Sequence, residues 1–166
     1  EHWVPRLAYA SHITDIDADA TSVSDLITGG TGGLGLLTAR WLAQRGANVL
    51  TLAARGGTLA RDVAHEWGQV QATRVAALAQ RCNTAETAHV RRIVLMGCAL
   101  KPATGVWHAA GVIADSLLPK QTAKGLAFVY APKMLGAGQL QNASTCAPLT
   151  AFVLFSSIAA LFGLAG

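Results

Sequence analysis

A glycine-rich segment directly after a short apolar strand is the feature of this sequence that most constrains its fold. Residues 28–35 read Thr-Gly-Gly-Thr-Gly-Gly-Leu-Gly, and the apolar pair Leu26-Ile27 precedes them. Because glycine lacks a side chain, the backbone N–H groups of such a turn can approach a pyrophosphate, and the start of a following helix adds partial positive charge. The spacing satisfies Gly-x-Gly-x-x-Gly at positions 30, 32 and 35.

The surroundings of the glycines are those that a nucleotide-binding turn needs. A helix is predicted after them, with four apolar residues on one face: Leu34, Leu37, Trp41 and Leu42. Arg45-Gly46 ends that helix, and residues 49–53 form a second apolar strand. Strand, glycine loop, helix and strand make a βαβ unit, which implies a parallel sheet. A glycine turn without a ligand and a methyltransferase-type nucleotide loop are the alternative interpretations.

The middle of the chain carries weaker patterns. Residues 75–78 predict a third strand, and residues 84–98 predict a helix. Four residues are predicted to form one side of that helix: Ala85, His89, Ile93 and Met96.

Clear patterns return in the last third of the chain. Residues 105–111 form an apolar strand that ends in small residues, and a helix is predicted over 122–144 with an interruption at Pro132. The apolar run 151–155 is typical of a strand buried on both faces. The whole pattern predicts an α/β fold with a doubly wound, Rossmann-type parallel sheet, truncated at its C-terminal end.

Composition and charge narrow the range of partners. The 166 residues are 52% hydrophobic and 13% charged, which suits one domain with a substantial core. The formal net charge is +4, but the arginines are dispersed, so we expect an anionic small ligand and no nucleic acid. No apolar run is long enough to span a membrane, and no secretory leader follows Glu1. Both ends look like cuts in a longer protein.

The cysteines and one histidine motif give no metal site. Cys82, Cys98 and Cys146 are widely spaced and odd in number, so we expect buried thiols in a reducing compartment without disulfides or zinc. The pair His65-Glu66 begins like a metalloprotease motif, but Gln69 stands where the second histidine would be. We therefore expect no bound metal.

The end of the second strand favours one form of the dinucleotide. An NAD site needs an Asp or Glu there to hold the ribose 2′-hydroxyl, whereas this chain has Ala53-Ala54-Arg55. The Arg55 guanidinium would instead pair with a 2′-phosphate, which predicts NADPH. The alternative is a surface arginine near a loop.

Four separated segments together resemble a known family. The stretch 26–55, GVWHAAGV at 105–112, PKMLGAGQL at 132–140 and FVLFSSIAA at 152–160 are similar, in this order, to landmarks of the ketoreductase domain of type I modular polyketide synthases. This domain belongs to the short-chain dehydrogenase/reductase superfamily. The animal-type fatty-acid synthase ketoreductase is the nearest alternative. Val4-Pro5-Arg6-Leu7 resembles the linker that leads into this domain, which predicts a linker over 1–22 and a partial NADP-binding domain over 23–166.

The resemblance implies an activity and a set of catalytic residues. The intact domain would reduce a β-ketoacyl thioester, carried on an acyl carrier protein, to the β-hydroxyacyl form with NADPH. The family's serine falls on Ser157 and its lysine on Lys133, while its tyrosine and asparagine would lie past Gly166. The chain alone is therefore expected to be inactive. Other domains of the same polyketide synthase are the further partners, and the location implied is cytoplasmic.

The residues expected to bind the cofactor are gathered at the ends of the predicted strands. They are Thr28, Gly29, Gly30, Thr31, Gly32, Gly33, Leu34, Gly35, Arg55, Asn83, His108, Ala109, Ala110 and Gly111. Asn83 stands where the resemblance places an adenine-contacting Asp. Asp115 suggests the B-type stereochemical class and a D-configured hydroxyl, with a helix-starting aspartate as the equal alternative.

A second functional class remains open from the sequence. A truncated or decayed reductase would be a nucleotide-binding or purely structural module without redox chemistry. A Tyr-x-x-x-Asn motif within about twenty residues after Gly166 would favour the enzyme.

Overall fold

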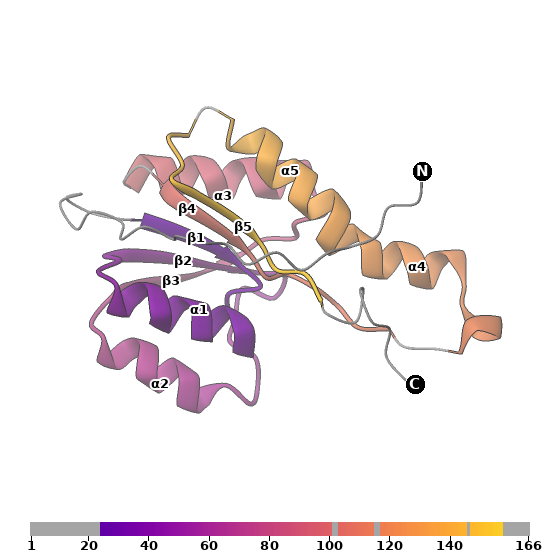
Figure 1. The fold of residues 1–166 in the computed structure, drawn as a ribbon, viewed down its shortest axis with the longest axis horizontal. Helices are drawn as coiled ribbons and strands as arrows, with labels where there is room; N and C mark the ends of the chain where they lie inside the picture. The colour runs from indigo at the N-terminus through magenta and orange to yellow at the C-terminus, as the bar shows by residue number, and fades with distance from the viewer. Residues whose placement is uncertain (1–23, 101–102, 115–116, 146, 158–166) are drawn as a thin grey trace, which may run out of the picture.

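The chain forms one parallel sheet covered by helices on both faces (Figure 1). The computed structural model describes residues 24–100, 103–114, 117–145 and 147–157, and the linker expected over 1–22 lies outside them. The strands are β1 (Ser24–Thr28), β2 (Val49–Ala54), β3 (Ala76–Arg81), β4 (Ala103–His108) and β5 (Ala151–Leu154). The α-helices are α1 (Gly33–Gln44), α2 (Ala64–Ala72), α3 (Thr87–Leu100), α4 (Ala123–Tyr130) and α5 (Gly136–Ala143).

The order of the strands sets the position of any ligand. All pairs are parallel, in the order β3-β2-β1-β4-β5, so the chain reverses its direction of travel between β1 and β4. Helices α1 and α2 cover one face, α3 and α5 cover the other, and α4 extends beyond the carboxyl ends of the strands (Figure 1). Ligands of open α/β sheets bind at such a reversal. The predicted doubly wound α/β fold is confirmed.

The buried face of α1 differs from the apolar face predicted from the sequence. Leu36, Ala39 and Leu42 of α1 are buried against the sheet. Leu34 and Leu37, expected on the same inner face as Leu42, are 52% and 45% exposed. The helix carries two apolar stripes, and the glycine turn fixes where the helix begins, so the stripe that starts at Leu36 faces the sheet.

Trp41, predicted on the same apolar face as Leu42, lies at the edge of the core. It is 37% exposed and packs edge-on against Trp107 of β4, with ring centroids 5.6 Å apart. The Arg45 guanidinium lies 4.6 Å from the centroid of the Trp41 ring. Trp41 therefore contributes to packing through its partners rather than through full burial.

The face of α3 differs from its prediction in a similar way. Val90, Ile93 and Val94 are buried, whereas Met96 is 37% exposed. Only Ile93 of the expected side is in the core. The β-branched residues form the wider apolar stripe of this helix, and they decide which side packs on the sheet.

The two outer strands are less buried than the central ones. β3 spans Ala76–Arg81, which confirms a strand near the predicted 75–78, and its residues are half-buried or exposed. β5 pairs with β4 alone in the described part of the chain, and Leu154 is 49% exposed. The prediction that this strand is buried on both faces is wrong for the residues described.

The helix predicted over 122–144 is confirmed, and Pro132 changes its form rather than ending it. The Thr122 hydroxyl caps α4 by accepting a hydrogen bond from the Gly125 N–H at 3.0 Å. Proline has no N–H and crowds the carbonyl four residues earlier. The chain widens there into a π-helical turn, Ala131–Leu135 (the π-turn), before α5 continues.

The described residues contain no group of three His, Cys, Asp or Glu side chains that would hold a metal. His65 and Gln69 of α2 contact each other through Nε2 atoms 2.8 Å apart. Cys82 is a buried free thiol, while Cys146 and the side chain of Cys98 lie outside the described part.

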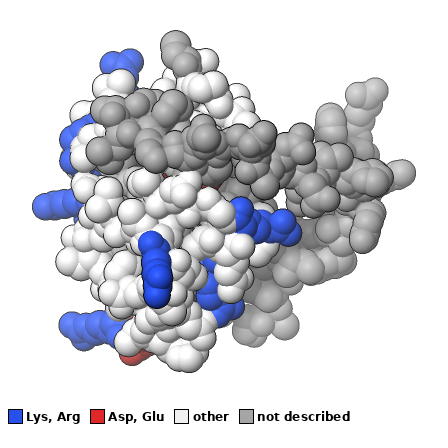
Figure 2. Space-filling view, turned by 90° about the vertical axis from the view of Figure 1, so that its left-hand side faces the viewer, with Lys and Arg blue, Asp and Glu red and all other residues white. Residues whose placement is uncertain are grey.

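The surface of the described part matches the charge pattern of the sequence. The Lys and Arg side chains visible in Figure 2 stand apart from one another instead of merging into one patch. Among the described residues, no helix is both long enough and apolar enough to cross a bilayer.

Candidate functional site

Three glycines of the turn are required by close backbone packing. Gly29 has a φ of +69°, and a Cβ there would lie 2.7 Å from the carbonyl carbon of Ala109. A Cβ on Gly30 would lie 2.6 Å from the Ile27 carbonyl oxygen, and one on Gly35 would overlap the carbonyl oxygen of Gly29. These residues bring β1, β4 and the start of α1 together.

The other two glycines of the turn, Gly32 and Gly33, have open space where a side chain would be. Gly32 caps α1, and Gly33 is its first residue. A Cβ on Gly33 would have no atom within 4 Å, and one on Gly32 would only reach the Gly29 oxygen at 3.5 Å. The first N–H groups of a helix have no partner within it and carry partial positive charge. The turn therefore presents free space and N–H donors at one place.

A pocket of about 770 Å³ lies beside this turn, at the carboxyl ends of β1, β2 and β4. Ten of the residues predicted to bind the cofactor line it: Gly29, Thr31, Gly32, Gly33, Leu34, Gly35, Arg55, Ala109, Ala110 and Gly111. Asp and Glu are absent from the described residues that line it. The site is thus suited to an anion with an extended shape.

Eleven further residues line the pocket that were not predicted. They are Ala53, Ala54, Gly56, Thr58, Leu59, Ala60, Cys82, Thr84, Val112, Ile113 and Pro132. Most of them lie at or just after the ends of β2, β3 and β4. The position of a residue directly after a predicted strand was therefore the signal that would have found them.

Arg55 follows β2 and is exposed at the rim of the pocket. Its guanidinium carbon lies 5.6 Å from the centroid of the Phe128 ring of α4. A cation at this distance from an aromatic face is attracted to it. The contact therefore links this residue of the pocket to α4.

Asn83 lies next to the pocket, but its side chain is engaged elsewhere. Its Oδ1 accepts a hydrogen bond from the Ala85 N–H at 3.2 Å, and its Nδ2 donates to Glu86 Oε1 at 2.7 Å. The neighbouring Cys82 and Thr84 are the residues that line the pocket.

Burial raises the pKa of the Cys82 thiol, an effect that Arg92 opposes in part, so this thiol stays protonated near neutral pH.

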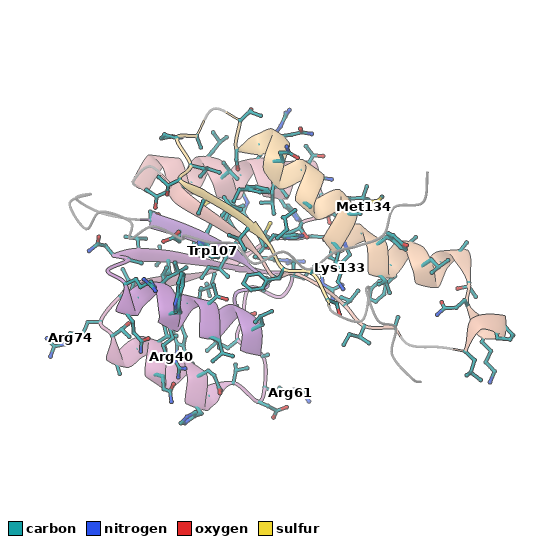
Figure 3. All side chains as sticks on the ribbon, in the orientation of Figure 1. Arg40, Arg61, Arg74, Trp107, Lys133 and Met134 are labelled. Atoms are coloured by element: carbon teal, nitrogen blue, oxygen red, sulfur yellow. The ribbon has the colours of Figure 1, made fainter. Side chains whose placement is uncertain are left out.

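Lys133 reaches the site from the π-turn. A Cβ on Gly111 would lie 3.0 Å from Lys133 Cε and 3.9 Å from Nζ. In Figure 3 Lys133 lies at the junction of α4 and α5, toward the carboxyl ends of the strands. The ammonium group therefore lies close to the small residues after β4.

Ser157 lies at the same edge of the sheet. Leu154 is paired with His108, and the Phe155 N–H donates to the His108 carbonyl oxygen at 3.0 Å. Ser157 follows β5 by three residues, as Gly111 follows β4, and it is exposed. It is not among the residues that line the pocket, and Asp115 lies outside the described part.

His108 and Thr28, both predicted to bind the cofactor, are buried behind the pocket. His108 Nδ1 and Thr28 Oγ1 are 2.6 Å apart. Burial lowers the pKa of His108, although the backbone carbonyls of Lys133 and Pro132 oppose this shift. The ring is therefore neutral near pH 7.

Comparisons with known proteins agree with this geometry. A model of the KR domain matches residues 24–166. The chain is 41% identical over 145 residues to the spectinabilin polyketide synthase system protein NorB of Streptomyces orinoci, which covers 85% of this chain and 7% of NorB. PlmKR1, the ketoreductase from the first module of phoslactomycin biosynthesis in Streptomyces sp. HK803, superposes with a TM-score of 0.77 and 34% identity over 87% of this chain and 34% of PlmKR1.

A more distant structure shows how widely the fold is shared. A short-chain type dehydrogenase/reductase from Mycobacterium marinum has a TM-score of 0.66 at 21% identity and covers 78% of this chain and 51% of its own.

The family match extends over the glycine turn, the pocket and both predicted catalytic positions. KR domains are oxidoreductases that work with a nicotinamide cofactor, and the chain spans about a third of the solved ketoreductase it resembles. The chain belongs to the KR domain family, the ketoreductases of polyketide synthases within the short-chain dehydrogenase/reductase superfamily.

Proposed function

We propose that the domain containing this chain reduces the β-keto group of an acyl thioester to a hydroxyl, with NADPH as reductant. When bound, NADPH supplies the hydride. The acyl chain would be carried on an acyl carrier protein, and the neighbouring domains of the same polyketide synthase would supply and consume it. The proposed location is cytoplasmic.

The observation that carries the proposal is the pocket at the carboxyl edge of the sheet. Its wall contains the open glycines Gly32 and Gly33, and its rim contains Arg55. A diphosphate fits the helix N-terminus, and a 2′-phosphate fits the guanidinium. Gly29 and Gly35 leave no room for a Cβ, so the backbone cradle depends on their identity.

Two side chains of the described part would serve the reaction. The Ser157 hydroxyl would donate a hydrogen bond to the ketone oxygen as negative charge develops on it. The Lys133 ammonium, which lies against Gly111, would hold the nicotinamide ribose and lower the pKa of a tyrosine acid. The resemblance places that tyrosine and an asparagine past Gly166.

The test is the reduction of a β-ketoacyl N-acetylcysteamine thioester by the full-length protein. The reaction is monitored through the loss of NADPH absorbance. We expect turnover with NADPH, and we expect Lys133→Met to reduce kcat by about a hundredfold, the size of an acid–base contribution. Lys124→Met is the matched control, because Lys124 is an exposed lysine of the adjoining helix α4. NADPH binding without any turnover would instead support a nucleotide-binding module without redox chemistry.

A further inference from the structure

We propose that His108 is a positioning residue that links β1 to the π-turn and thereby holds Lys133 in place against Gly111. The inference rests on the proposed function, since it concerns how the lysine of that reaction is oriented. It assigns His108 a place behind the cofactor pocket instead of a contact with the cofactor.

The first contact of His108 is with β1. Thr28 and His108 face each other on neighbouring strands, and Thr28 Oγ1 lies 2.6 Å from His108 Nδ1. Thr28 is 0% exposed and His108 is 4% exposed. Because burial keeps the ring neutral, one nitrogen accepts and the other carries the proton. The short distance suits Thr28 donating to Nδ1, which leaves the proton on Nε2.

The second side of the ring faces the π-turn. His108 Nε2 is buried and completes no hydrogen bond within the described residues. The backbone carbonyls of Lys133 and Pro132 are the groups that raise the pKa of this ring against the effect of burial. In the proposed arrangement, an N–H on Nε2 is directed toward the backbone that carries Lys133.

Packing around Gly136 holds the same turn from close range. A Cβ on Gly136 would lie 3.2 Å from His108 Cε1 and 2.8 Å from Thr84 Oγ1. Thr84 Oγ1 also donates to the Pro132 carbonyl oxygen at 3.3 Å. The start of α5 is thus pressed against His108 and Thr84.

The link from His108 to the π-turn matters because the Lys133 side chain is long and flexible. Lys133 is exposed, and its Cε and Nζ lie near the Cβ position of Gly111. The position of its backbone therefore decides which part of the pocket the ammonium reaches. A shift of about 1 Å in a positioned group can cost about a hundredfold in rate.

The experiment compares two substitutions in the full-length protein. The amide of His108→Asn lies near the position of Nδ1 and keeps the Thr28 contact, whereas His108→Gln reaches the position of Nε2 and keeps a donor toward the π-turn. We expect His108→Asn to lower kcat for thioester reduction about tenfold, with the Kd of NADPH changed less than about twofold. We expect His108→Gln to restore most of kcat.

A double-mutant cycle separates positioning from general damage. In a Lys133→Met background, His108→Asn should cause no further loss of kcat, because the group it positions is gone. Equal losses of kcat in both backgrounds would overturn the proposal. So would a fall in NADPH affinity that matches the fall in kcat.

A readout without activity keeps the test independent of the proposed function. Hydrogen exchange of residues 129–137 should accelerate about tenfold or more in His108→Asn and stay near the wild-type rate in His108→Gln. Unchanged exchange in His108→Asn would refute the link to the π-turn even if the wild-type protein reduces no thioester.

A second pair of variants covers the case in which changes at His108 prevent folding. Thr28→Val removes only the hydroxyl that contacts His108. Thr38→Val removes another buried threonine hydroxyl, one that donates to the Leu34 carbonyl oxygen of α1 at 2.9 Å. We expect faster exchange of residues 129–137 in Thr28→Val alone, and equal exchange in both variants would contradict the proposal.

Discussion

The Lys133 side chain lies against Gly111, with Cε 3.0 Å and Nζ 3.9 Å from the place where a Cβ on Gly111 would be. A cation from the π-turn and the open end of β4 therefore meet at the edge of the pocket. The contact depends on the absence of a side chain at position 111.

Gly111→Ala should displace the Lys133 amine without disturbing the fold. A contact of 3.0 Å with the end of a flexible side chain is relieved by moving that side chain. We expect kcat for thioester reduction to fall about tenfold to a hundredfold. Gly138→Ala, on α5 with no atom within 4 Å of its Cβ, is the control and should keep full activity. Equal kcat in the two variants would contradict the placement of the Lys133 side chain against Gly111.

Gly35→Ala and Gly33→Ala should separate packing from binding in the glycine turn. A Cβ on Gly35 overlaps backbone, so we expect its replacement to destabilise the protein by about 1–3 kcal/mol or more. A Cβ on Gly33 meets nothing, so Gly33→Ala should unfold at or above the wild-type temperature. It should nevertheless weaken NADPH binding, because the methyl group enters the pocket. Thermal unfolding and fluorescence titration measure the two effects, and a stable Gly35→Ala would contradict the packing.

Arg55→Ala should weaken NADPH binding while leaving NADH binding nearly unchanged. A hydrogen bond to a charged group contributes about 1.5–3 kcal/mol, so we expect roughly a tenfold to hundredfold rise in the Kd of NADPH. Arg61→Ala is the control, since Arg61 is an exposed arginine nearby that does not line the pocket. Equal losses for both cofactors would exclude Arg55 from recognition of the 2′-phosphate.

Asp25→Asn should stabilise the protein at neutral pH. Asp25 of β1 is 3% exposed, its Oδ2 has no partner within the described residues, and its Oδ1 accepts from Trp107 Nε1 at 3.0 Å. Burial raises the pKa of this carboxyl above its usual 3.8, and the Trp107 hydrogen bond opposes that rise.

The sign of the pH effect follows from that direction. An acid whose pKa is raised by folding favours the folded state below its unfolded pKa, and this advantage is lost as the pH rises through the folded pKa. The gain in unfolding free energy from Asp25→Asn should therefore be largest near pH 7 and should shrink toward pH 4. Chemical denaturation at several pH values measures it, and a gain that grows in acid would contradict the assignment.

The βαβ unit and the long helix were predictable because local signals specify them. The glycine-rich segment 28–35 and the apolar residues before it establish the turn. Thr122, Pro132 and Ser144 mark the start, the widening and the end of the helical segment. Which stripe of α1 faces the sheet was not predictable, because Leu34 and Leu36 begin equally apolar stripes. Only the three-dimensional start of the helix separates them.

Site residues that act through their backbone were predictable from the sequence. Side chains whose orientation depends on contacts with neighbouring residues were less predictable. The glycines and Arg55 line the pocket as expected. Asn83 is drawn away by Ala85 and Glu86, and His108 by Thr28. The partners of Asn83 lie only two and three residues along the chain, so this local turn could have been read from the sequence. Thr28, by contrast, is 80 residues from His108 on a neighbouring strand, and no spacing reveals that contact.

The most direct test of the glycine-turn account is a crystal structure of the full-length protein with NADP⁺. We expect the diphosphate to lie within hydrogen-bond distance of the backbone N–H groups of residues 32–35, and the 2′-phosphate to face the Arg55 guanidinium. Density for the nucleotide elsewhere, or an empty turn at saturating NADP⁺, would contradict it.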